Sequence, residues 1–325
     1  MRVEISNLIS LDASYDAVRQ QEIGDGVSIE SFTSNTKKAE LYELIKSKNE
    51  QDYHRLLFRE GLEHSHYTHR FFMSVSDISG PNDPRLKEAE QLIIRAIILA
   101  RIVRPAAIPI HPTSIRCFND DNGHVFCLVG THVGFYSKAY VGARSQHPKL
   151  TQSDAERIQS YWKPSQFIYD NRFNYLRIYR ALYMFNDACH IRPLNIRHVV
   201  LHAVLESLIC TSHLRNRLQI VQRLPQVTGL NSSQAETIYD LCADIKHSAA
   251  PNFLNSPDVE NLTPEDQQRE QASLWLENAL CELFRKILED RSFADDVAES
   301  MRFAQKYPVR DSNGKLVRDK KGNLI

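Results

Sequence analysis

The sequence predicts an α+β protein with three parts: a mixed α/β N-terminal domain at residues 1–148, an all-α helical bundle at 149–295, and a tail at 296–325. Two observations support this prediction. Before about residue 145, several runs are rich in the β-branched and aromatic residues that favour strands. After about residue 150, apolar residues recur at the spacing of helices. The length of 325 residues is sufficient for two domains.

The N-terminal domain combines predicted strands with predicted helices. Strands are expected at 27–33 (VSIESFT) and 70–78 (RFFMSVSDI), and at 106–118 and 124–141, which flank the turn sequence NDDNG. We interpret the last two as strands joined by a hairpin-like turn. Helices are expected at 38–58 and 83–103. Pro105 ends the second of these helices because proline cannot continue the hydrogen-bond pattern.

The second half of the chain reads as a bundle of four or five helices. Helical periodicity covers 150–162, 172–190, 195–212, 213–224, 233–247 and 263–290. The apolar faces of three of these helices are predicted from residues three or four apart. They are Phe173, Leu176, Tyr179 and Tyr183 in the second; Ile196, Val199, Val200, Ala203, Val204 and Leu208 in the third; and Ile238, Leu241, Cys242 and Ile245 in the fifth.

The composition limits how the chain could bind a nucleic acid and argues against a structural zinc site. Lys plus Arg equal Asp plus Glu at 40 each, so a nucleic acid would have to bind to a local patch. The six cysteines include no C-x-x-C pair, which argues against structural zinc and fits a reducing compartment.

The sequence also argues against secretion and membrane insertion. Its start lacks the apolar core of a signal peptide. The apolar stretch 92–103 is interrupted by Arg95 and Arg101 and is too short to span a bilayer. We therefore expect a cytoplasmic protein that does not interact with membranes.

A histidine cluster raises the question of a metal site. His64, His66 and His69 lie in the segment HSHYTHR, and in a strand the first two would share a face. We interpret the segment as a loop leading into a strand rather than as a metal site. With 11 glycines and no glycine-rich phosphate loop, the sequence predicts neither a metal nor a small-molecule cofactor.

Several segments follow one another in an order that is typical of one family. LTQSDAERIQSYW precedes RIYRALYMFNDACHIRPLNIRHVVLHAVLESLI, LRNRLQIVQRL and IYDLCADIKHS. In this order they resemble the HEPN superfamily, most closely its ApeA-like branch, with Glu206 in the usual setting of the second helix. AIILARIVRP followed by a strand also resembles the domain often found ahead of this bundle. The resemblance implies a homodimer that binds single-stranded RNA or cleaves it without a metal, in toxin systems or phage defence.

The family's catalytic signature, R-x(4–6)-H, lies near the end of the family's fourth helix, which corresponds to the predicted helix at 233–247. His247 occupies the histidine position, Cys242 stands at the arginine position, and Ser248 replaces the usual glycine. The resemblance implies that the histidine moves a proton and that a fixed cation stabilises the charge building on the phosphate. Asp244 and Lys246 lie within the same motif.

The missing arginine leaves two interpretations open. In the first, the cation comes from Lys246 or from an arginine of the predicted helix at 213–224, whose RNA-binding candidates are Arg215, Arg217 and Arg223. In the second, His247 merely ends a helix, where the helix dipole and Asp244 favour its charged form. The function is then either an RNA-binding or ribonuclease role, with an active or inactive site, or that of a non-catalytic dimeric interaction module.

The tail contains a small repeat. DSNGKLV at 311–317 and DKKGNLI at 319–325 share the pattern D-x-x-G-x-L, and both contain dipeptides typical of turns. The repeat predicts either a poorly ordered hairpin or an edge strand that pairs with a partner.

Overall fold

A computed structural model describes residues 2–10, 20–31, 67–80, 82–104, 113–119, 125–130, 150–189, 191, 194–246 and 264–325. The chain divides into two compact units, and the division falls inside helix α5 (Gln152–Asp170), between Lys163 and Pro164. A mixed α and β part is thus followed by a mostly helical part. The predicted boundary at 148/149 lies just ahead of this helix.

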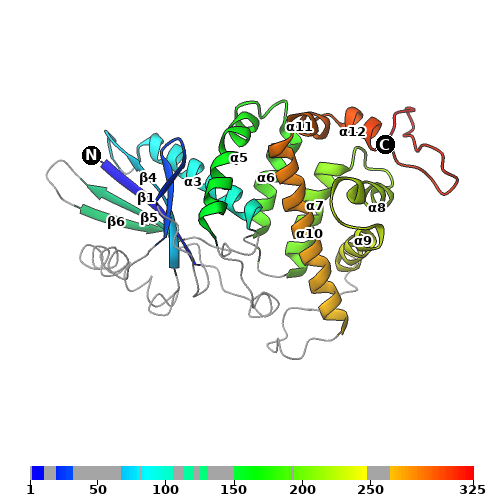
Figure 1. Ribbon diagram of the computed structural model, residues 1–325, viewed down its shortest axis with the longest axis horizontal. Helices are drawn as coiled ribbons and strands as arrows, with labels where there is room; N and C mark the ends of the chain where they lie inside the picture. Colours follow the sequence, from blue (N-terminus) through cyan, green and yellow to red (C-terminus); the bar gives the residue numbers. More distant parts are fainter. Residues whose placement is uncertain are drawn as a thin grey trace. The chain divides into compact units, whose positions relative to one another are not determined.

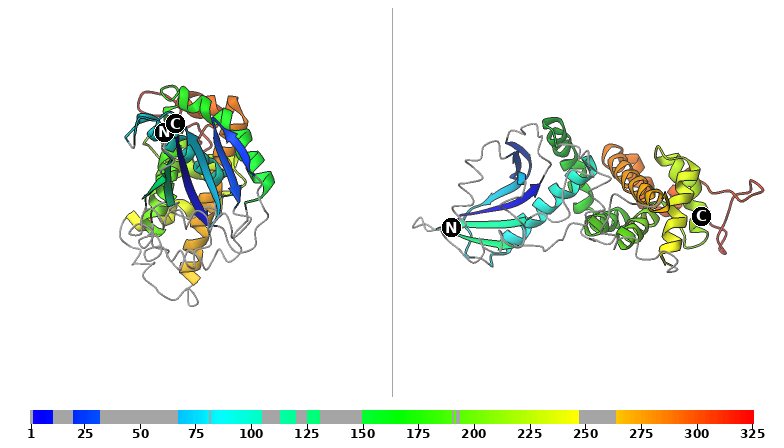
Figure 2. Two further views of the ribbon diagram at one scale, coloured as in Figure 1. Left: turned by 90° about the vertical axis from the view of Figure 1, so that its left-hand side faces the viewer. Right: turned by 90° about the horizontal axis from the view of Figure 1, so that it is seen from below.

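An antiparallel sheet of six strands forms the framework of the first unit, in the order β2-β3-β4-β1-β5-β6 (Figure 1, Figure 2). The strands are β1 Arg2–Ser10, β2 Gln21–Gly24, β3 Val27–Ser31, β4 Tyr67–Val75, β5 Thr113–Asn119 and β6 Val125–Gly130. β5 and β6 pair with Cys117 opposite Cys127, as a hairpin requires. The sequence interpretation missed β1 and β2. The helix predicted at 38–58 lies outside the described residues.

Helix α3 (Pro84–Val103) packs against β4, β1 and β3. Val3, Ile5 and Phe71 of the sheet and Ile93 and Ile97 of the helix are almost fully buried and share this core. Because apolar burial contributes about 25 cal/mol per Å², this packing stabilises the unit. In the described part of the chain, no helix is both long enough and apolar enough to span a membrane.

Trp162 of α5 requires a glycine in β2. A Cβ atom on Gly24, whose φ is +157°, would lie 2.2 Å from Cδ1 of the tryptophan ring, so a larger residue cannot be accommodated without displacing that ring. The indole Nε1 donates to Asp25 at 3.0 Å. On the ring face, the guanidinium of the buried Arg95 stacks at 3.8 Å. Arg95 Nη2 also donates to the carbonyl of Trp162, which explains a charge inside the apolar helix α3.

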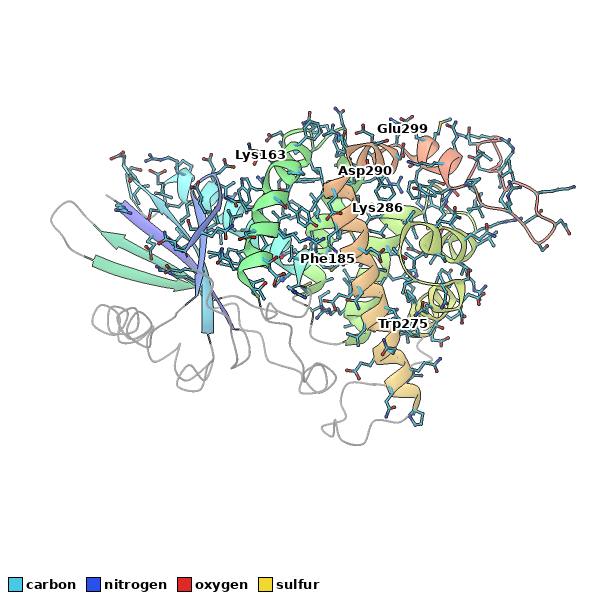
Figure 3. All side chains as sticks on the ribbon, in the orientation of Figure 1. Lys163, Phe185, Trp275, Lys286, Asp290 and Glu299 are labelled. Carbon is cyan, nitrogen blue, oxygen red and sulfur yellow. The ribbon has the colours of Figure 1, made fainter. Side chains whose placement is uncertain are left out.

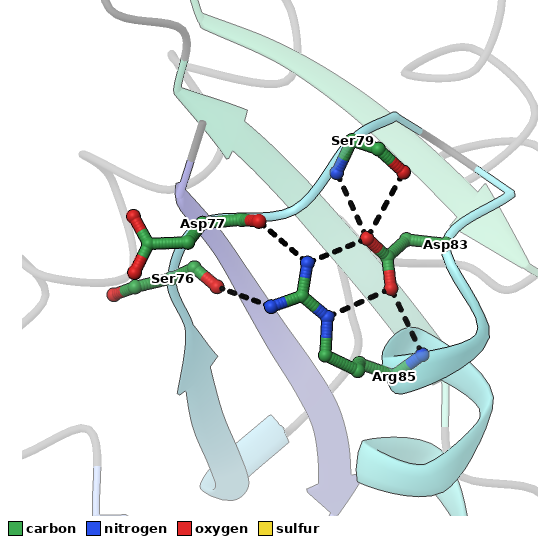
Figure 4. Close-up of polar contacts among 5 residues, drawn as sticks. All are labelled: Ser76, Asp77, Ser79, Asp83 and Arg85. Carbon is green, nitrogen blue, oxygen red and sulfur yellow. Dashed lines mark hydrogen bonds and ion pairs between the residues drawn. The ribbon is translucent and has the colours of Figure 1, made fainter.

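The start of α3 is fixed by Asp83, its N-cap residue (Figure 4). One carboxylate oxygen accepts hydrogen bonds from the backbone and side chain of Arg85, and the other accepts from Ser79 and from Arg85. Arg85 in turn donates to the carbonyls of Ser76 and Asp77. The hydrogen bond from Arg85 is the main reason that the pKa of Asp83 lies well below its ordinary value.

Replacing Asp83 tests this cap. Asp83→Ala is expected to lower the urea midpoint of unfolding more than Asp83→Asn, because asparagine still caps the helix but loses the charge that pairs with Arg85. Since the folded-state pKa is lowered, the contribution of the carboxylate is fully present above the ordinary aspartate pKa of about 4 and is lost as the pH falls below it. The gap between wild type and Asp83→Asn should therefore close at acidic pH, with the exposed Lys87→Ala as control. Equal midpoints for all three variants would contradict this role.

The second unit is helical, and α7 packs against four neighbours, α6, α8, α9 and α10 (Figure 1). The helices are α6 Leu176–Cys189, α7 Leu194–Ile209, α8 Asn216–Val227, α9 Ser232–Lys246, α10 Pro264–Glu289, α11 Arg291–Ala298 and α12 Ser300–Lys306. The last two were not predicted from the sequence.

Helix α10 contributes a continuous apolar face to this unit. The ring of its Phe284 meets Phe185 of α6 with centroids 5.3 Å apart, and Figure 3 shows Phe185 lying toward α10. Near the end of α10, Lys286 stacks over Phe293 at 4.7 Å, and Asp290 caps α11 by accepting from the backbone of Phe293. These contacts join α10 to α6 and α11.

Two of the predicted apolar faces were only partly correct. Phe173 is 82% exposed and precedes α6, Leu176 is 39% exposed, and Ile196 of α7 is 51% exposed, whereas the predicted Val204 and Leu208 of α7 are fully buried. In each helix the buried stripe is shifted from the predicted one and also fits helical spacing. The α6 stripe is Ile178, Ala181, Leu182, Phe185 and Cys189, and the α7 stripe is Leu201, Val204, Leu205, Leu208 and Ile209. In α9, the predicted Ile238, Leu241 and Cys242 are buried.

Candidate functional site

Helix α7 buries three polar side chains: Arg197, His198 and His202, which are 4%, 0% and 1% exposed. Arg197 Nη2 forms an ion pair with Glu277 of α10 at 3.0 Å. Both partners are buried, so the pair excludes water and ties α7 to α10. The cost of burying these charges makes the pair sensitive to the loss of either partner.

His198 uses both ring nitrogens for hydrogen bonds. Nε2 lies 3.2 Å from the carbonyl of Ile238 in α9, and Nδ1 lies 3.0 Å from Oγ of Ser273 in α10. Because a carbonyl only accepts, Nε2 carries the proton and Nδ1 accepts from the serine hydroxyl. Burial lowers the pKa of His198 to about 4, so the ring is neutral at physiological pH.

His202, one turn further along α7, is buried without such partners. Neither ring nitrogen has a hydrogen-bond partner among the described residues, and Nδ1 lies 3.7 Å from Oε1 of Glu206. The ring packs edge-on against Tyr239 of α9, with centroids 5.4 Å apart. Burial, followed by the charges of His198 and Lys246, lowers the pKa of His202 to about 3. The neutral ring therefore offers one donor and one acceptor that are not used.

A second unpaired polar atom lies close to His202. Asn216, the first residue of α8, donates from Nδ2 to Oε1 of Glu206 at 3.2 Å, but its buried Oδ1 has no hydrogen-bond partner in the described part of the chain. A buried polar atom without a hydrogen bond costs roughly 1–3 kcal/mol, and such atoms are uncommon in folded proteins. We call His202, Glu206, Asn216, Cys242 and Lys246 the α7–α9 cluster.

The α9 side of the cluster carries a thiol and an ammonium group. Cys242 is 1% exposed, and burial raises its pKa, so the thiol is protonated and neutral at physiological pH. Lys246, one turn further along, offsets part of that rise through its charge and a side-chain hydrogen bond. Because Lys246 also acts on His202, its charge lies close to both residues. The exposed Lys246 thus places a cation next to the position where the family signature has its arginine.

The three arginines predicted to bind RNA differ in their surroundings. Arg223 is fully buried and donates to the carbonyls of Tyr307 and Ile209, so the prediction that it contacts RNA was wrong. Arg217 is exposed but pairs with Glu236 and Asp240 of α9, each at 3.2 Å. Arg215 is exposed, directly precedes α8 and has a left-handed backbone conformation.

The remaining predicted site residues do not extend the cluster. Asp244 is exposed on α9. His247 and Ser248 lie outside the described residues, as do His64 and His66, and His69 is described only as a backbone position in β4. Across the described ranges, no group of three or more His, Cys, Asp or Glu side chains could hold a metal ion.

The sequence interpretation missed His202 and Asn216. Two histidines four residues apart within a strongly apolar helix were the available signal, since that spacing puts both on one face. Asn216 could not be found from the sequence, because its position depends on how α8 packs against α7. No protein-family model matches the chain, and neither a curated protein nor a solved structure matches it.

The cluster combines three kinds of group in one place. Lys246 supplies positive charge, Glu206 accepts hydrogen bonds, and His202 and Asn216 offer hydrogen-bonding atoms that no described residue uses. This set can bind an anionic group that also carries hydroxyl donors, as a ribose phosphate does.

The two buried histidines should respond oppositely to substitution. His198→Leu removes the partners of Ser273 and of the Ile238 carbonyl, so we expect a loss of about 2 kcal/mol in the free energy of unfolding. His202→Leu removes a ring that forms no hydrogen bond, so we expect a change within about 0.5 kcal/mol or a gain in stability. Denaturant unfolding of both variants checks this. A larger loss for His202→Leu than for His198→Leu would show that His202 has a structural partner.

The same histidines predict how stability depends on pH. Their folded-state pKa values, about 4 and about 3, lie below the unfolded value of about 6.5. Between these values the unfolded state binds more protons, so stability is fully present above pH 6.5 and falls as the pH is lowered. Each histidine should contribute a slope of about 1.4 kcal/mol per pH unit between pH 6 and 4. His202→Leu should therefore show a shallower slope than the wild type in urea unfolding measured across this range. Parallel profiles would contradict the burial of this ring.

Proposed function

We propose that this chain is a HEPN-like protein that binds single-stranded RNA at the α7–α9 cluster and carries metal-independent ribonuclease chemistry there. One observation carries the proposal: the charge of Lys246 acts on the buried His202, and both the His202 ring and Oδ1 of Asn216 lack hydrogen-bond partners among the described residues. Retained polar groups without partners are costly, and this cost is offset if a ligand supplies the missing hydrogen bonds.

The proposed reaction uses the residues in distinct roles. His247 takes the proton of a ribose 2′-hydroxyl, and the 2′-oxygen attacks the adjacent phosphorus. The bond from phosphorus to the 5′-oxygen breaks and that oxygen takes up a proton, which leaves a 2′,3′-cyclic phosphate and a 5′-hydroxyl. Lys246 stabilises the negative charge that builds on the phosphate. A lysine is a point charge without the bidentate geometry of arginine, so the expected rates are low.

The proposal includes a homodimer. Two copies related by a two-fold axis would bring the ends of their α9 helices together and form one composite cleft. In that arrangement Lys246 and His247 of each copy lie near the shared axis. The setting proposed for this activity is a toxin system or defence against phage, in the cytoplasm.

A second function is favoured by the lack of an arginine at position 242, where the family signature has one. Cys242 is buried and neutral at this position. Arg217 forms ion pairs with two acidic residues, and the side chain of Arg223 is buried. A protein with this site but no sufficient cation would act as a non-catalytic dimeric interaction module. The two functions differ in whether the purified dimer retains or cleaves RNA.

Substitutions at the end of α9 test the first function. His247→Ala is expected to lower the cleavage rate of a single-stranded RNA by about 100-fold or more, the usual contribution of a general acid or base. Lys246→Ala should weaken both binding and cleavage, and Lys246→Arg should restore or raise them because arginine binds phosphate bidentately. Arg180→Ala, an exposed change on α6, serves as control. A folded dimer that neither retains nor cleaves RNA would leave the interaction module as the function.

A further inference from the structure

Residues 309–325 form two successive eight-residue repeats, VRDSNGKL and VRDKKGNL, followed by Ile325. Each repeat is a small hairpin, closed by backbone bridges between Arg310 and Leu316 and between Arg318 and Leu324. We call these residues the tail hairpins.

Each hairpin is held by its own turn. In the first, the N–H of Asp311 donates to the carbonyl of Lys315 and the N–H of Gly314 donates to the carbonyl of Asp311, both at 2.9 Å. Gly314 has φ +74° and its counterpart Gly322 has φ +85°, the left-handed conformation that a type I turn followed by a bulge requires. The side chain of Asp311 accepts two further backbone N–H groups at 2.9 Å, from Asn313 and Lys315.

The hairpins are stacked on each other and attached to α8. The N–H of Val317 donates to the carbonyl of Val309 at 2.9 Å, and the N–H of Ile325 donates to that of Val317 at 3.3 Å. These three side chains are buried together, with Leu218 of α8 packed against them. Gln222 of α8 exchanges two hydrogen bonds with the backbone of Arg310, at 2.7 and 2.8 Å. The repeat is therefore an ordered extension of α8, and ordering it costs no entropy when a ligand binds.

The tail hairpins are strongly basic in a chain that has no net charge. They contain five basic and two acidic side chains, a surplus of three positive charges. Both aspartates accept hydrogen bonds from backbone N–H groups of their own turns, and neither forms an ion pair with a described residue. The five basic side chains are all exposed: Arg310, Lys315, Arg318, Lys320 and Lys321.

The repeat places like charges in equivalent positions. Arg310 and Arg318 lie near the start of successive hairpins. Each donates one side-chain N–H group to the carbonyl of the glycine in its own turn, at 2.9 and 2.7 Å. The other donors of each guanidinium have no hydrogen-bond partner within the tail. Aligned like charges repel and destabilise a folded element, and a polyanion removes that repulsion. On α8, the exposed Arg215 lies one turn before Leu218 and thus continues the basic surface.

We propose that the tail hairpins and Arg215 bind the phosphate backbone of single-stranded RNA, alongside the α7–α9 cluster. This inference rests on the proposed function, since it assigns the surface that holds the strand outside the reactive site. Repeated cations on a rigid element fit a chain of regularly spaced phosphates, and such contacts are independent of base sequence. Asn216 follows Arg215 directly, so the two sites meet at the start of α8.

Binding of a fluorescent oligouridine to the full chain over a range of salt concentrations tests the inference. The tail variant carries Lys315→Gln, Lys320→Gln and Lys321→Gln, and a matched control carries three exposed changes elsewhere, Lys87→Gln, Lys163→Gln and Arg180→Gln. Each lost phosphate contact lowers the slope of log affinity against log salt by about 0.7, so the tail variant should lose about 2 in slope. Its affinity at 0.1 M salt should fall by roughly tenfold to 100-fold, while the control retains the affinity of the wild type.

The outcomes separate this inference from the proposed function. If the tail variant binds with unchanged affinity and slope while Lys246→Ala weakens binding, the inference is overturned and the proposed function stands. If the tail variant loses binding while Lys246→Ala has no effect and no cleavage occurs, the tail assignment is supported and the reactive site is not. Binding of anionic lipid vesicles without any binding of RNA would overturn the tail assignment.

Discussion

The burial of three polar side chains of α7 is the constraint on which the second unit depends. Each of these groups leaves water when the helices pack, and each then needs a partner inside the protein. Arg197 finds Glu277 on α10, and His198 bonds to both α9 and α10, so the rotation and height of these helices relative to α7 are fixed by polar contacts as well as by apolar packing. The same packing leaves His202 without a partner among the described residues, and this gap marks the candidate site.

The charged side chains of this chain, whose net charge is zero, differ in burial and in ion pairing. Around α8, one arginine is used inside the fold to bind carbonyls, one is held by acids of α9, and one remains at the surface. In the tail hairpins, the aspartates accept hydrogen bonds from the backbone of their own turns, while the lysines are exposed. A protein with no net charge therefore presents a local positive surface, which its composition could not reveal.

Sequence patterns predicted the elements better than they predicted the faces. The β5–β6 pair and the buried side of α9 followed from composition and periodicity. The face of α6 did not, and that of α7 followed only in part, because both helices are apolar over more than one stripe and the choice is made by their neighbours. Strand β1 lies between β4 and β5, so pairing on both edges supports a segment whose composition alone is undistinguished. The hydrogen bond between Asn216 and Glu206 joins two helices, and the sequence pattern of neither helix predicts it.

The eight-residue period of the tail has a consequence for how such a chain can change over generations. Each hairpin closes within its own repeat, and among the described residues it forms backbone hydrogen bonds to its neighbour and, in the first repeat, hydrogen bonds to α8. An in-frame duplication or deletion of one repeat would therefore lengthen or shorten the array by one complete layer without altering the fold of the rest. Arrays of different length would then differ in the extent of their cationic surface, so that copy number, rather than the identity of any single residue, becomes the quantity on which selection acts.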